Sequence, residues 1–162
     1  MMGCSMCDHF AATRNHVRVV QRLMLRIAHL IIEAAMRHDD SKYDPEEASL
    51  FAAVLPRLRG STYGSDEYRS TLREIRPAIE HHNRVNAHHP EHFANGIDGM
   101  SLVNLVEMIC DWKAATLRHA DGDIERSIEV NRDRFEMTEQ LCSILKNTVD
   151  RELRDALKET DA

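Results

Sequence analysis

The spacing of apolar residues constrains this fold more than any other feature of the sequence. Between residues 14 and 37 they recur every three or four positions, which places them on one face of an amphipathic helix. The same period returns along the chain, and no segment alternates apolar and polar residues as a half-buried strand does. The sequence therefore predicts an all-α fold, a compact helical bundle of about five to seven helices. The core-facing stripe of the first helix is expected to contain Val20, Leu23, Ile27, Leu30, Ile31 and Ala34.

Capping and breaking residues place the other helices. Asp44 and Pro45 read as an N-cap and a first-turn proline, so a helix is expected to begin there and to stop before Pro56. A second helix is expected over residues 66–82, with a kink at Pro77. The remaining predicted helices cover residues 101–119, a short stretch from 124, and about 132–157.

Length and charge limit the class of protein. A chain of 162 residues is long enough for one domain with its own core, expected over residues 14–157, with a flexible tail over 1–13 and a frayed end over 158–162. A net charge of −6 without a block of lysine or arginine disfavours a nucleic-acid groove. No apolar run approaches the roughly 18 residues of a membrane span, and the start lacks a secretory signal. We therefore expect a soluble, cytoplasmic protein without a membrane partner.

The stretch HDDSK, residues 38–42, is the first candidate for chemistry. His38 and Asp39 follow the first helical segment, and Asp111 lies at the edge of a buried face on a later helix. A buried aspartate without a partner is costly, so it should pair with a cation or a donor. His16 shares the apolar stripe of the first helix. Taken singly, each residue also fits an ordinary structural role, but together they form a set of two imidazoles and two carboxylates that suits a divalent metal.

These positions resemble the HD-domain metal-dependent phosphohydrolases. In that family a histidine on one helix, a His-Asp doublet ending the next, and an aspartate on a later helix bind one metal within an all-α bundle. The resemblance implies that a metal ion is bound by His16, His38, Asp39 and Asp111. It does not distinguish Mn, Co, Ni, Fe, Mg and Zn. Lys42 matches the HDxxK variant of the pattern.

Three longer segments strengthen this resemblance. Together, HDDSKYDPEE, EHHNRVNAHHPEHF and LVEMICDWKAAT resemble an uncharacterised, largely phage-associated family of short HD-like proteins. A phage-encoded member would act in the host cytoplasm.

The distance between the first two expected ligands requires a bend. His16 and His38 lie 22 positions apart, and one straight helix would separate them by about 33 Å. The chain is therefore expected to turn sharply near residues 26–30. His9 and His29 are the alternatives to His16 as first ligand.

Five of the ten histidines fall within EHHNRVNAHHPEH, residues 80–92. Three roles remain open for them: ligands of a second metal, acids or cations that contact phosphate, or exposed loop residues. The candidates for a second metal or for acid-base work are His82, His88, His89 and His92.

Other charged residues would support such a site. Arg84 suits bidentate contact with phosphate, and Lys42 is expected to share that role. Glu107, one helical turn before Asp111, and Glu91 are candidates to contact a metal ligand without binding the metal themselves. Glu107 is equally well interpreted as an ordinary exposed helix glutamate.

The resemblance implies metal-assisted hydrolysis of a phosphoester or phosphoanhydride, with a nucleotide or deoxynucleotide as the small-molecule substrate. Two alternatives remain open. One is an HD-type dimetal iron oxygenase, which needs two more histidines between the doublet and the late aspartate. The other is a noncatalytic nucleotide-binding or inhibitory module. The bundle is also expected to self-associate as a homo-oligomer.

Overall fold

The computed structural model describes residues 5–60, 65–117 and 122–154. Those residues form α-helices and short 3-10 helices without a strand, which confirms the predicted all-α fold. The chain divides after His38 into two compact units, Met1–His38 and Asp39–Ala162. The single domain expected over residues 14–157 stays a prediction. The frayed end expected at residues 158–162 lies outside the described residues.

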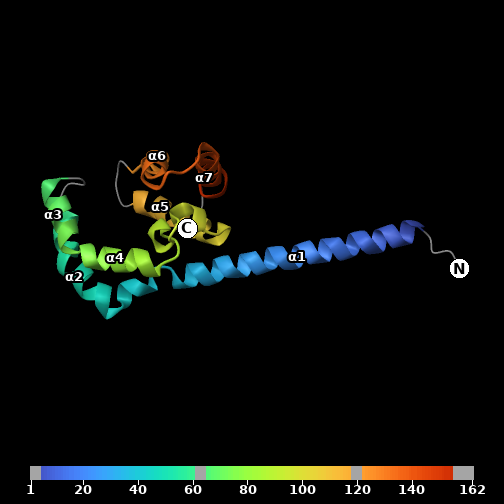
Figure 1. Cartoon of the computed structure of the whole chain (residues 1–162), viewed down its shortest axis with the longest axis horizontal. Coiled ribbons are helices and arrows are strands. Elements are labelled where there is room, and N and C mark those ends of the chain that lie inside the picture. Colours follow the sequence, from blue (N-terminus) through green and yellow to red (C-terminus); the bar gives the residue numbers. More distant parts are fainter. Residues whose placement is uncertain (1–4, 61–64, 118–121, 155–162) are drawn as a thin grey trace, which may run out of the picture. The chain divides into compact units, whose positions relative to one another are not determined.

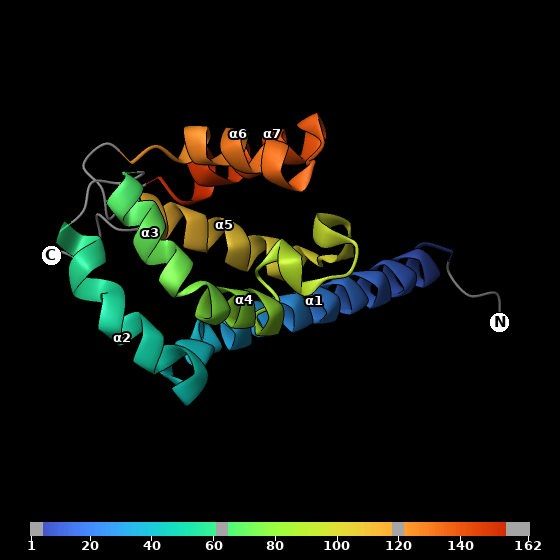
Figure 2. The same cartoon turned by 60° about the vertical axis from the view of Figure 1, so that its left-hand side comes forward.

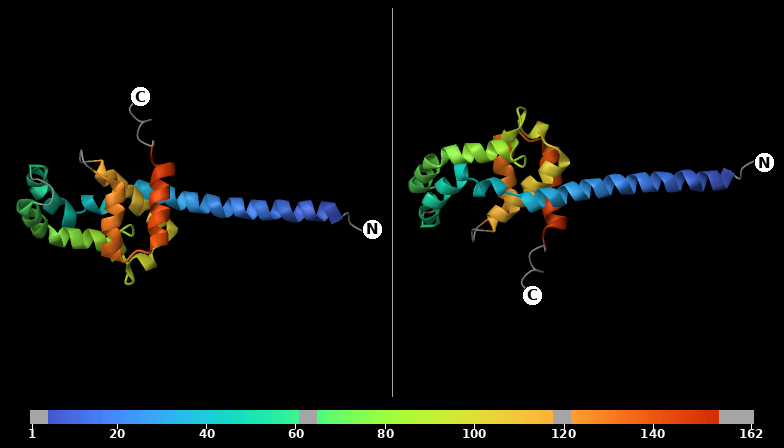
Figure 3. Two further views of the ribbon diagram at one scale, coloured as in Figure 1. Left: turned by 90° about the horizontal axis from the view of Figure 1, so that it is seen from above. Right: turned by 90° about the horizontal axis from the view of Figure 1, so that it is seen from below.

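The first unit consists of one long helix, α1 (Ser5–Arg37), drawn as an uninterrupted ribbon in Figure 1. Residues 5–13, expected to belong to a flexible tail, are helical, while residues 1–4 lie outside the described part of the chain. The turn expected near residues 26–30 is absent, and Figure 3 shows the helix continuous from two opposite sides. No glycine or proline occurs between residues 5 and 37 to break it.

The apolar stripe of α1 is not buried as expected. Leu23 is 63% exposed and Ile27 is 46% exposed. In the described part of its own unit, residues 5–38, α1 has no second element to pack against. Among the described residues, no helix combines the length and the apolar character needed to cross a membrane.

The first half of the second unit packs α2 against η1, α3 and α4. α2 passes through Pro56, so the predicted stop there is wrong; one proline removes a single backbone hydrogen bond, and the rest of the helix tolerates that loss. A kink was expected at Pro77, but the structure has a break at Ile75, after which a new helix begins. Pro77 lies in the first turn of that helix, a position that suits proline. The elements are η1 (Asp40–Tyr43), α2 (Pro45–Gly60), α3 (Asp66–Glu74) and α4 (Arg76–Val85).

The second half contains three capped helices. Ser101 and Asn104 form a capping box at the start of α5, and Asp123 and Thr138 cap α6 and α7. The helix predicted from residue 124 does begin there, but it continues to Phe135, and the second helix begins at Glu139 and not at about 132. Glu136 adopts a left-handed conformation, with φ of 52°, and ends α6 there. The elements are η2 (Pro90–His92), η3 (Gly96–Gly99), α5 (Leu102–Thr116), α6 (Ile124–Phe135) and α7 (Glu139–Glu152).

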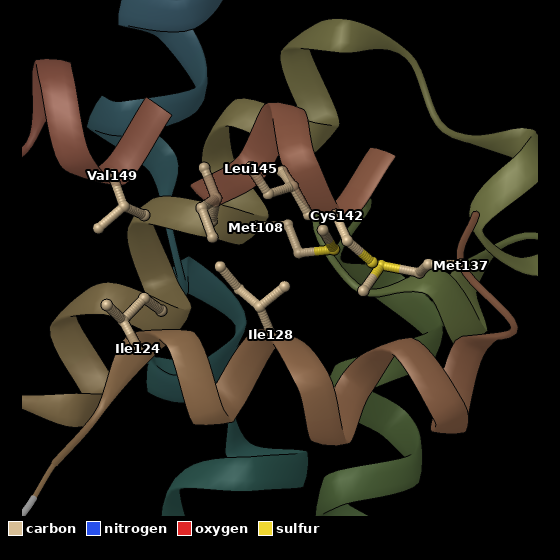
Figure 4. Close-up of a cluster of buried hydrophobic side chains, with 8 residues drawn as sticks. Met108, Ile124, Ile128, Met137, Cys142, Leu145 and Val149 are labelled. Carbon is tan, nitrogen blue, oxygen red and sulfur yellow. The ribbon is translucent and has the colours of Figure 1, made fainter. Parts of the chain in front are cut away.

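The main apolar core lies among these three helices. α6 and α7 run side by side (Figure 2), and α5 packs against both. Figure 4 shows side chains of α6 and α7 meeting Met108 of α5. The core consists of Met108, Ile109, Ile124, Ile128, Met137, Cys142, Leu145 and Val149. This packing fixes α5, whose Glu107 and Asp111 are four residues apart and therefore share a face of the helix.

Candidate metal centre

Three histidines of the second unit form a tight group, here called the histidine cluster: His82, His88 and His89. Each offers a ring nitrogen, and the three nitrogens lie within 4.8 Å of one another. Ring centroids are 4.8 Å apart between His82 and His89 and 4.2 Å apart between His88 and His89. His82 and His88 are buried. Three imidazoles at this separation could hold one metal ion.

The end of α4 brings these rings together. His82 lies in the last turn of the helix, and Asn86 ends the helix in an extended conformation. The Asn86 side chain donates to the backbone carbonyl of His82 at 2.8 Å, and the backbone carbonyl of Asn86 accepts the amide N–H of His89 at 3.1 Å. The chain then enters η2 at the buried Pro90. This turn folds the segment that carries His88 and His89 back onto His82.

Asp39 adds a carboxylate to the histidine cluster. Its Oδ1 lies 3.2 Å from Nε2 of His82 and 3.5 Å from Nε2 of His88. Its Oδ2 accepts a hydrogen bond from the ammonium group of Lys42. One oxygen of Asp39 and one of Asp111 also lie within 4.8 Å of each other. The structure therefore joins the aspartate of HDDSK to the histidine cluster and to the late aspartate.

The backbone of Asp39 is unusual. Its φ is 60° and its ψ is 18°, which is the left-handed region. Aspartate enters this region more readily than most residues, since its short polar side chain can form local hydrogen bonds. The Asp39 carbonyl accepts the amide N–H of Lys42 at 2.9 Å, which begins η1. Lys42 is thereby held beside the Asp39 carboxylate by the backbone as well as by the ion pair.

Two glutamates orient the rings from behind. Glu47 of α2, fully buried, contacts Nδ1 of His82 at 3.0 Å through one oxygen and Nδ1 of His81 at 2.8 Å through the other. Glu107 of α5 contacts Nδ1 of His88 at 3.0 Å. A carboxylate at Nδ1 keeps the proton on that nitrogen, so the lone pair of Nε2 is available to a metal. In both His82 and His88, Nε2 is the nitrogen that faces Asp39.

His89 also fits metal binding. Its Nε2 is buried and has no hydrogen-bond partner among the described residues. Burial is the main cause that lowers the pKa of His89 from 6.5 to about 3, and the neighbouring His88 and His82 lower it further. His89 is therefore neutral at physiological pH, as a metal ligand must be. Together with Asp39, the histidine cluster could hold a metal ion.

The long helix separates the first two ligands expected from the sequence. His16 lies 21 residues before Arg37 in α1, which corresponds to about 30 Å along a straight helix. Within one chain, the expected sharing of one metal by His16 and His38 is therefore not seen. His9 lies still farther along α1, and His29 is exposed with its Nε2 at 3.3 Å from Glu33. His38 is the last residue of the first unit, and its role as a ligand stays a prediction.

Three other expected residues lie on the surface. His92 donates Nδ1–H to the carbonyl of Arg84 at 2.6 Å and is exposed. Glu91 pairs with Arg134. Arg84 is exposed, and it points about 200° around α4 from His82, since the two residues are two positions apart. The structure places none of the three in the histidine cluster.

The sequence analysis missed Glu47 and His81. In the sequence, Glu47 looks like an ordinary acidic residue of a helical first turn, a position that favours glutamate for electrostatic reasons alone. Its partners follow 34 and 35 residues later in the chain, so no local spacing connects them. The adjacent histidines His81 and His82 were the signal in the sequence that pointed to a shared partner. Two adjacent histidines near a helix end can both reach one carboxylate.

The comparisons with known proteins give one match. No curated protein and no solved structure matches the chain. A family model matches residues 5–159, nearly the whole sequence, and describes DUF5662, a family of unknown function. The match spans η1, α2, α4 and α5 and so includes every residue of the candidate metal centre. This chain therefore belongs to the DUF5662 family.

Proposed function

We propose that the protein is a metal-dependent phosphohydrolase that acts on a phosphoester or phosphoanhydride of a nucleotide or deoxynucleotide. The observation that carries the proposal is the buried histidine cluster with Asp39, oriented by Glu47 and Glu107. The HD-like sequence pattern around His38 and Asp39 gives the reaction class by resemblance.

The ligands proposed are the histidine cluster and Asp39, with Asp111 close enough to take part. A bound divalent ion would polarise a phosphoryl oxygen and lower the pKa of a bound water. Three ring nitrogens in the donor set favour Zn, Fe, Mn, Co or Ni over Mg, which prefers oxygen ligands. Lys42 is partly exposed beside Asp39, so its ammonium group can reach both the site and a bound phosphate. It would neutralise charge that develops on the phosphate.

One observation favours a second candidate, the HD-type dimetal oxygenase. Between the His-Asp doublet and Asp111 the chain supplies three clustered histidines, and that reaction needs at least two. An oxygenase would contain a pair of iron ions, absorb visible light and consume oxygen. The phosphohydrolase would release phosphate without oxygen.

The deciding experiment is elemental analysis of the purified full-length protein combined with a phosphate-release screen. The screen would cover nucleotides and deoxynucleotides with Mn, Co, Ni, Fe, Mg and Zn in turn. We expect at least one divalent ion per chain and phosphate release from some members of the panel. Metal-loaded protein that binds nucleotides but releases no phosphate would instead support the noncatalytic module, and oxygen consumption would support the oxygenase.

Lys42 gives a sharper test of phosphate contact. Lys42→Ala should keep its metal but lower kcat/KM by about tenfold or more, because a charge-assisted contact to phosphate is lost. Arg84→Ala is the matched control. It also removes a cation close to His82 in the sequence, but Arg84 points away from the histidine cluster, on the opposite face of α4. It should behave as wild type. Wild-type kinetics in Lys42→Ala would contradict the assigned role.

A further inference from the structure

The apolar residues of α1 follow a seven-residue repeat. With Phe10 at position a of the heptad, eight of the nine a and d positions are apolar, and Thr13 is the exception. A strict seven-residue repeat kept over four heptads is the pattern of a left-handed coiled coil. The a positions are Phe10, Val17, Met24 and Ile31, and the d positions are Met6, Thr13, Val20, Ile27 and Ala34. We call these nine residues the α1 seam.

The α1 seam is exposed over most of its length. From Met6 to Ile27, the exposed fractions of its large apolar side chains run from 37% at Val20 to 66% at Met24. Leu23, at the adjacent g position, is also exposed and widens the apolar strip. Helices in water owe most of their stability to the packing of such a face. A seam of this length therefore indicates a partner.

The length of α1 indicates what that partner is. With 33 residues, α1 is about 50 Å long. The other α-helices of the described residues have between 9 and 16 residues, so the longest of them is about 24 Å long. Even the longest of these could cover only a little more than half of the seam, which is about 42 Å long from Met6 to Ala34. A helix with the same length and the same heptad repeat is the α1 of a second copy. We propose that two chains associate through their α1 seams in a coiled coil.

Charge is arranged in a way that permits this pairing. α1 carries five arginines and only two acidic residues, so two copies would repel if those arginines lined the contact. Instead Arg18, Arg22 and Arg26 occupy the outer b, f and c positions. The other two arginines flank the seam near its ends, Arg14 at e and Arg37 at g. Pairing would bury on the order of 500 Å² on each helix. The total, about 1,000 Å², is where specific interfaces begin.

Adjacent valines allow a matched test in the full-length chain. Val20 lies in the seam at d, whereas Val19 lies at c, outside the seam, and is exposed to a similar degree. The wild type should have the mass of a dimer or higher oligomer by light scattering at about 10 μM. Val20→Glu combined with Ile27→Glu should shift it to the monomer, and Val19→Glu should leave the wild-type mass unchanged.

Circular dichroism of all variants would show that helix is retained. A wild type that is monomeric across the concentration range would overturn the proposal and would indicate that the seam is covered within the same chain. A loss of association in Val19→Glu equal to that in the seam variant would also overturn it. Neither result depends on the metal or on the reaction proposed for the second unit.

Discussion

Asp39→Asn should abolish metal binding and reduce phosphate release by roughly 100-fold or more while leaving the helical content unchanged. Asparagine keeps the shape of the side chain and also tolerates the left-handed backbone found at residue 39. The substitution therefore removes the charge that faces His82 and His88 without straining the turn. Replacing a residue that only contacts a metal ligand typically lowers metal affinity or activity by about 10- to 100-fold. Replacing a direct ligand should lower them at least as much. Elemental analysis and circular dichroism would measure both effects.

The neighbouring Asp40 provides the control. It is exposed in the first turn of η1, and Asp40→Asn should keep wild-type metal content and rate. Asp111→Asn should lose metal as Asp39→Asn does, because a carboxylate oxygen of Asp111 lies within 4.8 Å of one of Asp39. If Asp39→Asn and Asp111→Asn both keep the wild-type metal content, the proposed site is excluded.

Glu47→Gln should weaken metal binding by about 10- to 100-fold. Glutamine has nearly the same volume but lacks the charge, so the proton on Nδ1 of His82 is held less firmly and Nε2 is a poorer ligand. Glu47→Ala should in addition lower the free energy of unfolding by about 1–3 kcal/mol, because a buried hydrogen-bonding partner is lost. Competition with a chelator and denaturant unfolding of the metal-free protein would separate the two effects.

Two variants make this prediction specific to Glu47. Glu46→Gln changes the adjacent, exposed residue of the same helical turn and should bind metal as the wild type does. His81→Gln removes the other partner of Glu47 without altering His82, and its effect should be smaller than that of Glu47→Gln. Equal metal affinity in Glu47→Gln and in the wild type would show that the buried glutamate is structural only.

The helical class could be predicted from the sequence because the apolar period is a property of each segment alone. Several helix ends could also be predicted from the sequence. Asp123, for example, is a short polar residue in an extended conformation and caps α6. Helix ends could not be predicted where one residue type favours continuing the helix and the observed structure ends it, or the reverse. Pro56 removes one hydrogen bond from α2 without ending it, and Glu136 ends α6 although glutamate is a good helix former. The length of α1 was missed because the helix was expected to begin at residue 14 and to turn near residues 26–30.

The candidate site could be predicted in part for a similar reason. His82, His88 and His89 stood out by their density, and Glu107 was singled out by its place one turn before Asp111. The sequence did not show in which direction each of these side chains points. His92 is as close in sequence to His89 as Asn86 is, yet its ring turns outward to the Arg84 carbonyl. Nothing in the sequence shows which way a loop side chain points.

The two halves of the second unit are held together by different chemistry. Among its described residues, the buried polar side chains all come from the half before α5, whereas the main apolar cluster belongs largely to α5, α6 and α7. The buried polar residues are Ser41, Glu47, Thr71, His82 and His88. Apolar packing holds its strength across ordinary changes of pH and metal supply, but a network of histidines and carboxylates does not. The first half also buries Val54, Ile75 and Ala78, so a bound metal would add to this smaller apolar core. Loss of the ion would then loosen the first half more than the second and expose it to proteases first.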